Sequence, residues 1–219
     1  MTEFLAVNGT QILEGFWNTI RIVLSGFVLG ALIGAPLGLA RQGRHALPRI
    51  IAGAYVEAIR NTPFLIQASL LFAFAGVLRL RLPMEMLGIT AVALYTAAYM
   101  AEIVRGALLA IPAGQWEAAD ALGLGKAQAF RLVVLPQLMP FALPASTNLF
   151  ATVTKESAFL SALSVAELTF AGQVVIARTF AVFEVWALVG ALYLMFILAL
   201  FAVSERLERH FAWARHSRS

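Results

Sequence analysis

The sequence contains no cysteine and few charged residues, which make up only 13% of its 219 positions. The absence of cysteine excludes disulfide bonds, iron–sulfur clusters and thiolate chemistry. Soluble domains carry about a quarter charged residues, so this shortage of charge, with a hydrophobic share of 61%, indicates a membrane protein. Because a spanning helix takes about twenty residues, we expect about five spans and no soluble catalytic domain.

The segment 1–15 contains no lysine or arginine. A cleaved signal peptide has a basic region at its start, so we expect this segment to remain in the mature chain. The spacing of Leu5, Ile12, Leu13 and Phe16 predicts an amphipathic helix that lies on the outer surface of the membrane.

Patterns for metal binding and catalysis are also missing. The three histidines, His45, His210 and His216, have no acidic residues nearby at ligand spacing, so we expect no metal site. The stretch around Gly123 and Lys126 fails as a phosphate loop, because aspartate and alanine occupy its required glycine and serine or threonine positions. We therefore expect this chain to hold no cofactor and not to be an enzyme.

Long apolar runs predict an all-α membrane protein whose residues 1–219 form a single transmembrane domain. The five expected spans cover residues 16–40, 50–78, 85–109, 136–156 and 185–204. The region 157–183 is interrupted by polar residues, which favours a re-entrant or outer-surface helical segment.

Glycine recurs every fourth residue in the first of these spans, and proline does so at the start of the fourth. The first span has glycine at every fourth position, namely Gly26, Gly30, Gly34 and Gly38. Such a stripe lets two helix backbones approach closely in lipid, and lining a pore is the alternative. The start of the fourth span has proline at every fourth position, at 136, 140 and 144, which predicts a bent or widened helix.

Two acid–base pairs lie inside the predicted spans, Glu57 with Arg60 and Glu102 with Arg105. A separation of three residues lets the members of each pair meet on one helix face, which lowers the cost of holding a charge in the membrane. For Glu57 and Arg60, a local pair near the lipid headgroups competes with a role in substrate passage or gating. For Glu102 and Arg105, an anchoring role at the end of the helix is favoured.

The longest polar interruption lies between the third and fourth spans, at residues 115–135. A short amphipathic helix is expected from Gln115 to Leu122. Gly123 can adopt the left-handed conformation that ends such a helix. A second helical run, from Lys126 to Leu135, is closed by Pro136, so the pattern predicts a helix–turn–helix knob between two spans.

This stretch carries a resemblance to a known family. Glu117-Ala118-Ala119, three residues, Gly123, nine residues, Val133 and then Leu135-Pro136 is similar to the EAA motif of permease subunits in bacterial binding-protein-dependent ABC importers. The stretches 57–67, 98–115 and 154–167 resemble the polar amino acid branch of that family, with its histidine, glutamine and arginine permeases. The likeness covers roughly residues 15–205. Asp120 departs from it, since relatives often have a basic residue there.

The resemblance implies the type I ABC importer permease fold, with a cytoplasmic coupling helix between spans three and four. It implies that the chain forms half of a translocation pathway and couples to an ATP-binding subunit. The residues expected to make that contact are Trp116, Glu117, Ala118, Ala119, Asp120, Gly123, Leu124 and Lys126. ATP and Mg²⁺ are then expected on the partner subunit.

The partners implied are two ATP-binding subunits, a second permease subunit that is identical or related, and a periplasmic or lipid-anchored amino-acid-binding protein. Membrane lipid is expected as surroundings, and nucleic acid is not expected as a partner. The candidate substrate contacts are Tyr95, Tyr99, Asn148, Thr152, Lys155 and Glu156. A zwitterion in lipid needs partners for both charges, although Lys155 and Glu156 also fit an interpretation in which they mark the outer end of the fourth span.

The basic residues orient the predicted spans. Ten lie in the segments on one side, at positions 41, 44, 49, 105, 126, 131, 206, 209, 215 and 218, and four lie on the other, at 79, 81, 155 and 178. The positive-inside rule then places the C-terminus and the knob in the cytoplasm and the N-terminus outside. The resemblance implies the bacterial cytoplasmic (inner) membrane.

Two other classes of membrane protein remain as alternatives. A self-sufficient secondary transporter or channel for a small polar solute is expected to show internal repeats around broken helices, and none is evident at this length. A membrane scaffold has no need of the EAA spacing, so a substitution at Gly123 would leave it unaffected.

Overall fold

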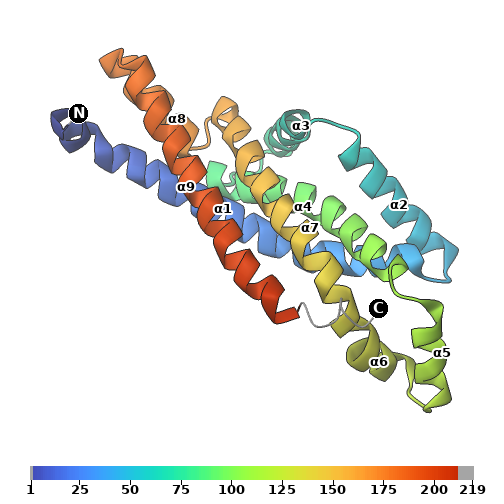
Figure 1. Cartoon of the computed structure of the whole chain (residues 1–219). Helices are drawn as coiled ribbons and strands as arrows, with labels where there is room; N and C mark the ends of the chain where they lie inside the picture. Colours follow the sequence, from blue (N-terminus) through green and yellow to red (C-terminus); the bar gives the residue numbers. More distant parts are fainter. Residues whose placement is uncertain (1, 212–219) are drawn as a thin grey trace.

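The structure is a computed structural model that describes residues 2–211, and this part of the chain consists of helices and turns (Figure 1). The elements in chain order are α1 (Thr2–Gln42), α2 (Ala46–Arg60), α3 (Phe64–Val77), α4 (Met84–Leu109), α5 (Ala113–Ala121), α6 (Lys126–Ala129), a π-helical turn (Phe130–Val134), α7 (Leu135–Glu156), a 3₁₀ helix (Ser157–Leu163), α8 (Leu168–Thr179) and α9 (Val182–Phe211). The predicted all-α class is confirmed.

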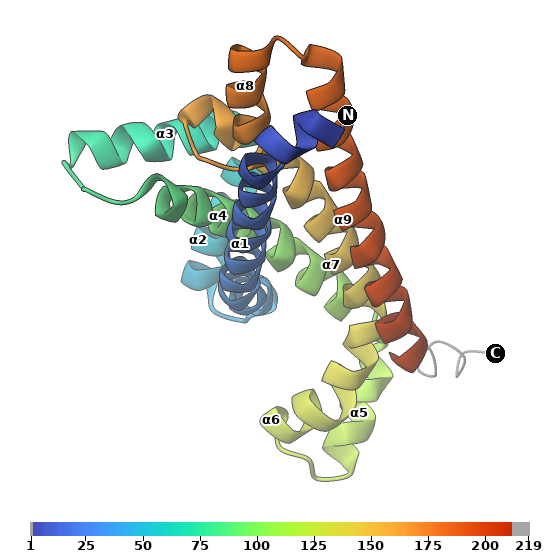
Figure 2. The same cartoon turned by 90° about the vertical axis from the view of Figure 1, so that its left-hand side faces the viewer.

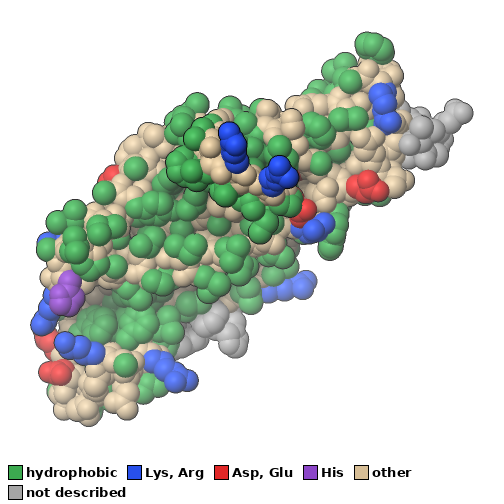
Figure 3. Space-filling model, turned by 180° about the vertical axis from the view of Figure 1, so that it is seen from behind, with side chains coloured by type: hydrophobic (Ala, Val, Ile, Leu, Met, Phe, Trp, Pro, Cys, Tyr) green, Lys and Arg blue, Asp and Glu red, His purple; other side chains and the backbone are tan. Residues whose placement is uncertain are grey.

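Four helical segments in the described part are long and apolar enough to cross a membrane: Asn8–Gln42, Met84–Leu109, Lys126–Leu163 and Val182–Glu208. They include the expected first, third, fourth and fifth spans. Large apolar side chains on α1 and α9, such as Leu32 and Leu198, are exposed, as lipid-facing residues would be. Figure 3 shows hydrophobic side chains over much of one face, with charged side chains gathered at one end and a few others among the hydrophobic ones.

The expected second span, residues 50–78, is divided, which corrects the sequence prediction. The chain breaks at residues 61–63, and α2 and α3 then run in different directions (Figures 1 and 2). Pro63 has no N–H to donate and disfavours helical backbone in the residue before it. The Gln67 side chain stabilises the break, since its Nε2 donates to the carbonyl oxygens of Ile59 at 2.6 Å and Thr62 at 2.7 Å.

The N-terminal segment also differs from the expectation of a separate surface helix. It is continuous with the first span in α1, which is 41 residues long. Packing explains the continuity, because Ile12 is buried against Leu168 and Val175 of α8 and Val185 of α9.

The glycine stripe of α1 lies directly against α4. A Cβ atom on Gly26 would stand 2.4 Å from Val92 Cγ1, and one on Gly34 would stand 2.4 Å from the carbonyl oxygen of Ala97. Gly30 and Gly38 approach α4 as closely. Of the two interpretations of this stripe, close helix packing is therefore the one the structure supports.

A buried carboxyl group joins α8 to its neighbours. Glu167 is fully buried and caps α8 by accepting from the backbone N–H of Phe170 at 2.7 Å. Its other oxygen accepts from the Tyr193 hydroxyl of α9 at 2.7 Å. Next to it, Thr19 of α1 accepts from the backbone N–H of Leu168 at 3.0 Å. The sequence alone shows Glu167 only as a polar interruption between apolar runs. Its role as a helix cap with partners on other helices could not be predicted, because such contacts produce no periodic pattern in the sequence.

The buried carboxyl group of Glu167 should make the stability of the protein depend on pH. The residue lies between the spanning segments, and its burial raises the pKa of the carboxyl group, against hydrogen bonds that lower it. A carboxyl whose pKa is raised on folding binds its proton more tightly in the folded state. The free energy of unfolding should therefore be highest below its ordinary pKa, about 4.3, and fall as pH rises from there through the raised pKa.

The Glu167→Gln variant should lose this slope, since glutamine keeps an acceptor for Phe170 and does not ionise. The measurement is the thermal midpoint of the purified protein from about pH 4 to 8. Glu184→Gln, an exposed change in the first turn of α9, is the matched control and should keep the slope. An unchanged slope in Glu167→Gln would assign the pH dependence to other groups.

Candidate functional site

Helices α5 and α6 form a knob that projects beyond the end of the bundle (Figure 2). Its α5 begins two residues before the predicted start and ends one residue before the predicted end. Ala119 is 2% exposed, whereas Leu122 is 78% exposed. Ala119, one of the expected contact residues, therefore packs inside the knob, and exposed residues such as Ala118 and Leu122 form the surface that is open to another protein.

The turn of the knob is built as its sequence predicts. Gly123 has a φ of +72°, in the left-handed region. Its N–H donates to the Asp120 carbonyl at 2.9 Å, and the Leu124 N–H donates to the Ala119 carbonyl at 3.1 Å. This pair of bonds is the Schellman motif, which satisfies the last carbonyls of α5. A Cβ on Gly123 would meet nothing within 4 Å, so backbone conformation is what favours glycine here.

The other residues of the expected contact lie on the same projection. Trp116, Glu117, Ala118, Asp120 and Lys126 are exposed, and Leu124 is half-buried. The structure thus gathers these residues into one knob. What they contact stays a prediction.

The knob is connected to the bundle through α7. The helical run that begins at Lys126 continues past Pro136, which corrects the expectation that this proline closes it. Pro136 stands in the first turn of α7, directly after the π-helical turn Phe130–Val134, where a missing backbone donor is tolerated. The Gln137 side chain donates to the Gln115 side chain at 2.9 Å, which ties the start of α7 to α5.

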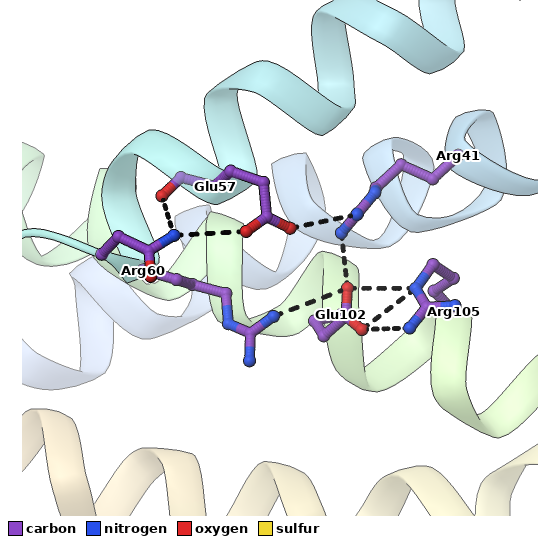
Figure 4. Close-up of polar contacts among 6 residues, drawn as sticks. Arg41, Glu57, Arg60, Glu102 and Arg105 are labelled. Carbon is purple, nitrogen blue, oxygen red and sulfur yellow. Dashed lines mark hydrogen bonds and ion pairs between the residues drawn. The ribbon is translucent and has the colours of Figure 1, made fainter.

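A cluster of charged side chains lies where α1, α2 and α4 meet (Figure 4). Glu102 is at its centre, with its side chain 22% exposed. It accepts from Arg105 on its own helix, at 3.0 Å from Nε, and from Arg41 of α1. The predicted neighbours Glu102 and Arg105 therefore do pair.

The other predicted pair is rearranged. Glu57 lies 3.5 Å from Arg41, while Arg60 lies 3.8 Å from Glu102, so each contacts a charge on another helix. The physical reason is the packing of α2 across α1 and α4, which brings Arg41 and Glu102 to the side chains of α2. Local spacing carries no signal for Arg41 in this role, since it stands sixteen residues from Glu57 and sixty-one from Glu102.

The candidate substrate contacts fall into two groups. Tyr95 and Tyr99 stack on α4 with ring centres 4.5 Å apart, and Glu156 of α7 is close enough to Tyr95 to act on it electrostatically. The Arg60 guanidinium carbon lies 5.7 Å from the centre of the Tyr99 ring. The arginine of α2, the two tyrosine rings of α4 and the glutamate of α7 therefore lie in sequence, with a cation at one end and a carboxylate at the other.

The remaining candidates stand on α7. Asn148 and Lys155 are exposed, and Thr152 is half-buried with its hydroxyl donating to the Asn148 carbonyl at 2.9 Å. Their contact with a substrate stays a prediction. Within residues 2–211, no group of three or more histidine, aspartate or glutamate side chains could hold a metal ion.

Comparison with known proteins gives consistent matches over nearly the whole chain. Residues 26–213 match the family model described as "Binding-protein-dependent transport system inner membrane component". The glutamine transport system permease protein of Escherichia coli (strain K12) is 34% identical over 200 residues, covering 90% of this chain and 91% of that protein. The octopine transport system permease protein of Rhizobium meliloti is 34% identical over 215 residues, covering 92% and 87%.

Solved structures agree with this. An amino acid ABC transporter with histidines superposes with a TM-score of 0.86 at 30% identity, covering 94% of this chain and 96% of that one. A methionine ABC transporter in an inward-facing conformation gives a TM-score of 0.81 at 25% identity, covering 92% and 96%.

Proposed function

Because this chain belongs to the family of binding-protein-dependent transport system inner membrane components, we propose that it is the permease subunit of an ATP-driven importer for polar amino acids. The observation that carries the proposal is the knob, in which the Gly123 turn holds α5 with its outer residues exposed, as a docking surface for another subunit requires. The names of the relatives, which transport glutamine or octopine, support the substrate class.

In this proposal the knob lies in the cytoplasm and receives the ATP-binding subunit, which holds ATP and Mg²⁺ and carries out hydrolysis. The distribution of basic residues supports this orientation, with the N-terminus outside and the C-terminus inside. The chain forms half of the pathway and pairs with a second permease subunit, identical or related. An amino-acid-binding protein delivers the substrate from outside, and the membrane is the bacterial cytoplasmic one.

The connection between the knob and the bundle suggests how the coupling works. α4 leads into α5, and α6 continues into α7, so a displacement of the knob acts on both helices at once. Proline at positions 136, 140 and 144 removes three backbone donors from the start of α7. We propose that α7 bends there when the ATP-binding subunits close, alternating access to the side chains of α4 and α7.

The test is co-purification of the tagged chain from solubilised membranes, with partners identified and ATP hydrolysis assayed. The native chain should bring down an ATP-binding subunit, whereas Gly123→Asp should lose it and lose uptake while still inserting. Aspartate in the left-handed region costs about 1 kcal/mol, and it adds a negative charge beside the helix end, where the helix dipole is unfavourable to it.

Gly190→Ala is the matched control for Gly123→Asp. Its Cβ meets nothing within 4 Å in α9, and it should retain the partner. If the native chain purifies alone and moves solute in vesicles without ATP, a secondary transporter replaces the proposal. If the variant at Gly123 keeps both partner and uptake, the knob is not the coupling element.

A further inference from the structure

The charge cluster of α1, α2 and α4 does not balance. It contains three guanidinium groups, of Arg41, Arg60 and Arg105, and two carboxylates, of Glu57 and Glu102, which leaves a surplus of one positive charge. The cluster is therefore short of one anion. The Arg41 and Glu102 side chains at its centre are only 16% and 22% exposed, whereas Glu57 and Arg60 at its edge are 58% and 36% exposed. Ionisable groups among spanning helices mark candidate functional sites, and an exposed edge lets a ligand reach Arg60.

Arg60 is the member whose charge is least matched. Arg41 and Arg105 both donate hydrogen bonds to Glu102, and Arg41 also reaches Glu57. The Arg60 nitrogen lies 3.8 Å from Glu102, beyond hydrogen-bonding distance, and its side chain is 36% exposed. In Figure 4, Arg60 and Arg105 approach Glu102 from opposite sides, and the two other nitrogens of the Arg60 guanidinium have no dashed contact.

The surroundings of Arg60 orient it toward the candidate substrate contacts. Its guanidinium lies over Tyr99, and Tyr99 stacks on Tyr95, which lies within electrostatic range of Glu156. A guanidinium held by a ring on one side keeps its donors in a fixed plane, which suits two parallel hydrogen bonds to a carboxylate. The break after α2, at residues 61–63, places Arg60 at the end of its helix rather than within a packed interface.

We propose that Arg60, held over Tyr99, binds the α-carboxylate of the transported amino acid. This inference rests on the proposed function and adds to it the residue that receives one of the two charges of the zwitterion. The ligand class is an amino acid with a free α-carboxylate. The anion that the cluster lacks is then supplied by the substrate, for as long as the substrate occupies the pathway.

The charge count of the cluster also predicts the stability of a variant at Arg60. Arg60→Gln removes the surplus charge and leaves the hydrogen bonds of Glu102 to Arg41 and Arg105 in place. The thermal midpoint of the variant should therefore equal or exceed that of the native protein, while substrate binding falls. A residue needed only for structure would show the reverse, with lower stability and unchanged binding.

The experiment uses the complex as it co-purifies, placed in nanodiscs of phosphatidylcholine, with radiolabelled L-histidine and L-glutamine as probes. Unlabelled L-histidine and L-histidinamide compete for the site, since the amide has the same side chain and no carboxylate. In the native complex the acid should compete about thirtyfold better than the amide. In Arg60→Gln the two should compete equally, and Arg60→Lys should fall between, because lysine keeps the charge without the planar fork.

Arg81→Gln, an exposed change in the segment before α4, is the matched control and should behave as the native protein. An unchanged preference for the acid in Arg60→Gln, in a complex that still takes up amino acids with ATP, overturns this inference and leaves the proposed function standing. Absence of ATP-driven amino acid uptake by the native complex overturns the proposed function itself.

A lipid phosphate is the other anion that Arg60 could hold, and a second measurement separates the two sources. Adding phosphatidylglycerol to the nanodiscs should shift the thermal midpoints of the native protein and of Arg60→Gln by the same amount. If phosphatidylglycerol stabilises the native protein and not the variant, with no difference between acid and amide, Arg60 is a lipid site and the inference is wrong.

Discussion

Gly34→Val should leave no folded protein to purify. A Cβ atom at this position would stand 2.4 Å from the Ala97 carbonyl oxygen and 2.8 Å from the Met100 Cβ. Both neighbours belong to a helix that is packed on several sides, so neither can move by an ångström without opening the interface between α1 and α4. Overpacking of a core costs about 1–3 kcal/mol for small insertions, and valine adds two methyl groups beyond the atom that already clashes.

The measurement is the yield of monodisperse protein on size exclusion after extraction in detergent, with Gly34→Ala as a graded second variant. Gly34→Ala should give protein with a lower thermal midpoint, since only the Cβ must be accommodated. Gly190→Ala, in a helix where a Cβ meets nothing within 4 Å, controls for the effect of alanine in a spanning helix. Native yield from Gly34→Val would mean that the stripe is not a packing interface.

The glycine stripe shows which features the sequence can predict. A four-residue repeat is local, so the helix face that carries it follows from the order of the residues alone. The partner helix does not, because the residues of α4 that face the stripe, such as Val92 and Met100, are of types that recur along much of the chain. The knob shows the same limit. Its turn at Gly123 can be predicted from adjacent residues, whereas the hydrogen bond between Gln115 and Gln137 that ties it to α7 cannot.

The divided second span shows a different limit. Hydropathy joins residues 50–78 into one apolar run, because it averages over Pro63 and the polar residues beside it. Pro63 removes a helical hydrogen bond, yet whether the helix kinks or breaks there depends on how the freed carbonyl groups are satisfied. Here the Gln67 side chain takes the carbonyls of Ile59 and Thr62, and no rule of sequence spacing identifies that partner in advance.

Side-chain pairs are predicted correctly only where both members share a helix and nothing competes. Glu102 and Arg105 meet as their spacing suggests. Glu57 and Arg60 have the same spacing, but Arg41 and Glu102 of other helices are the partners within reach. Tertiary contacts between full charges outweigh a local pair, which is worth only about 0.2–0.5 kcal/mol on an isolated helix.

Glu102→Gln is expected to have the second largest effect, because it removes the one carboxylate that three arginines share. The surplus of positive charge rises from one to two around a half-buried centre, where the Arg41 side chain is 16% exposed. Losing hydrogen bonds between charged groups costs about 1.5 kcal/mol, so the thermal midpoint should fall by several degrees. Glu14→Gln, an exposed change in α1, should leave the midpoint at the native value.

A double variant then separates charge balance from hydrogen-bond geometry. Adding Arg60→Gln to Glu102→Gln returns the surplus to one, although it restores no hydrogen bond. If charge balance sets the stability of the cluster, the double variant should recover about 1 kcal/mol of the loss, a coupling that contacting residues commonly show. If the effects of the two substitutions on stability only add, the hydrogen-bond geometry at Glu102 sets the stability of the cluster. The surplus positive charge would then have no energetic consequence in the empty transporter, and the argument that assigns Arg60 to the substrate carboxylate would lose its support.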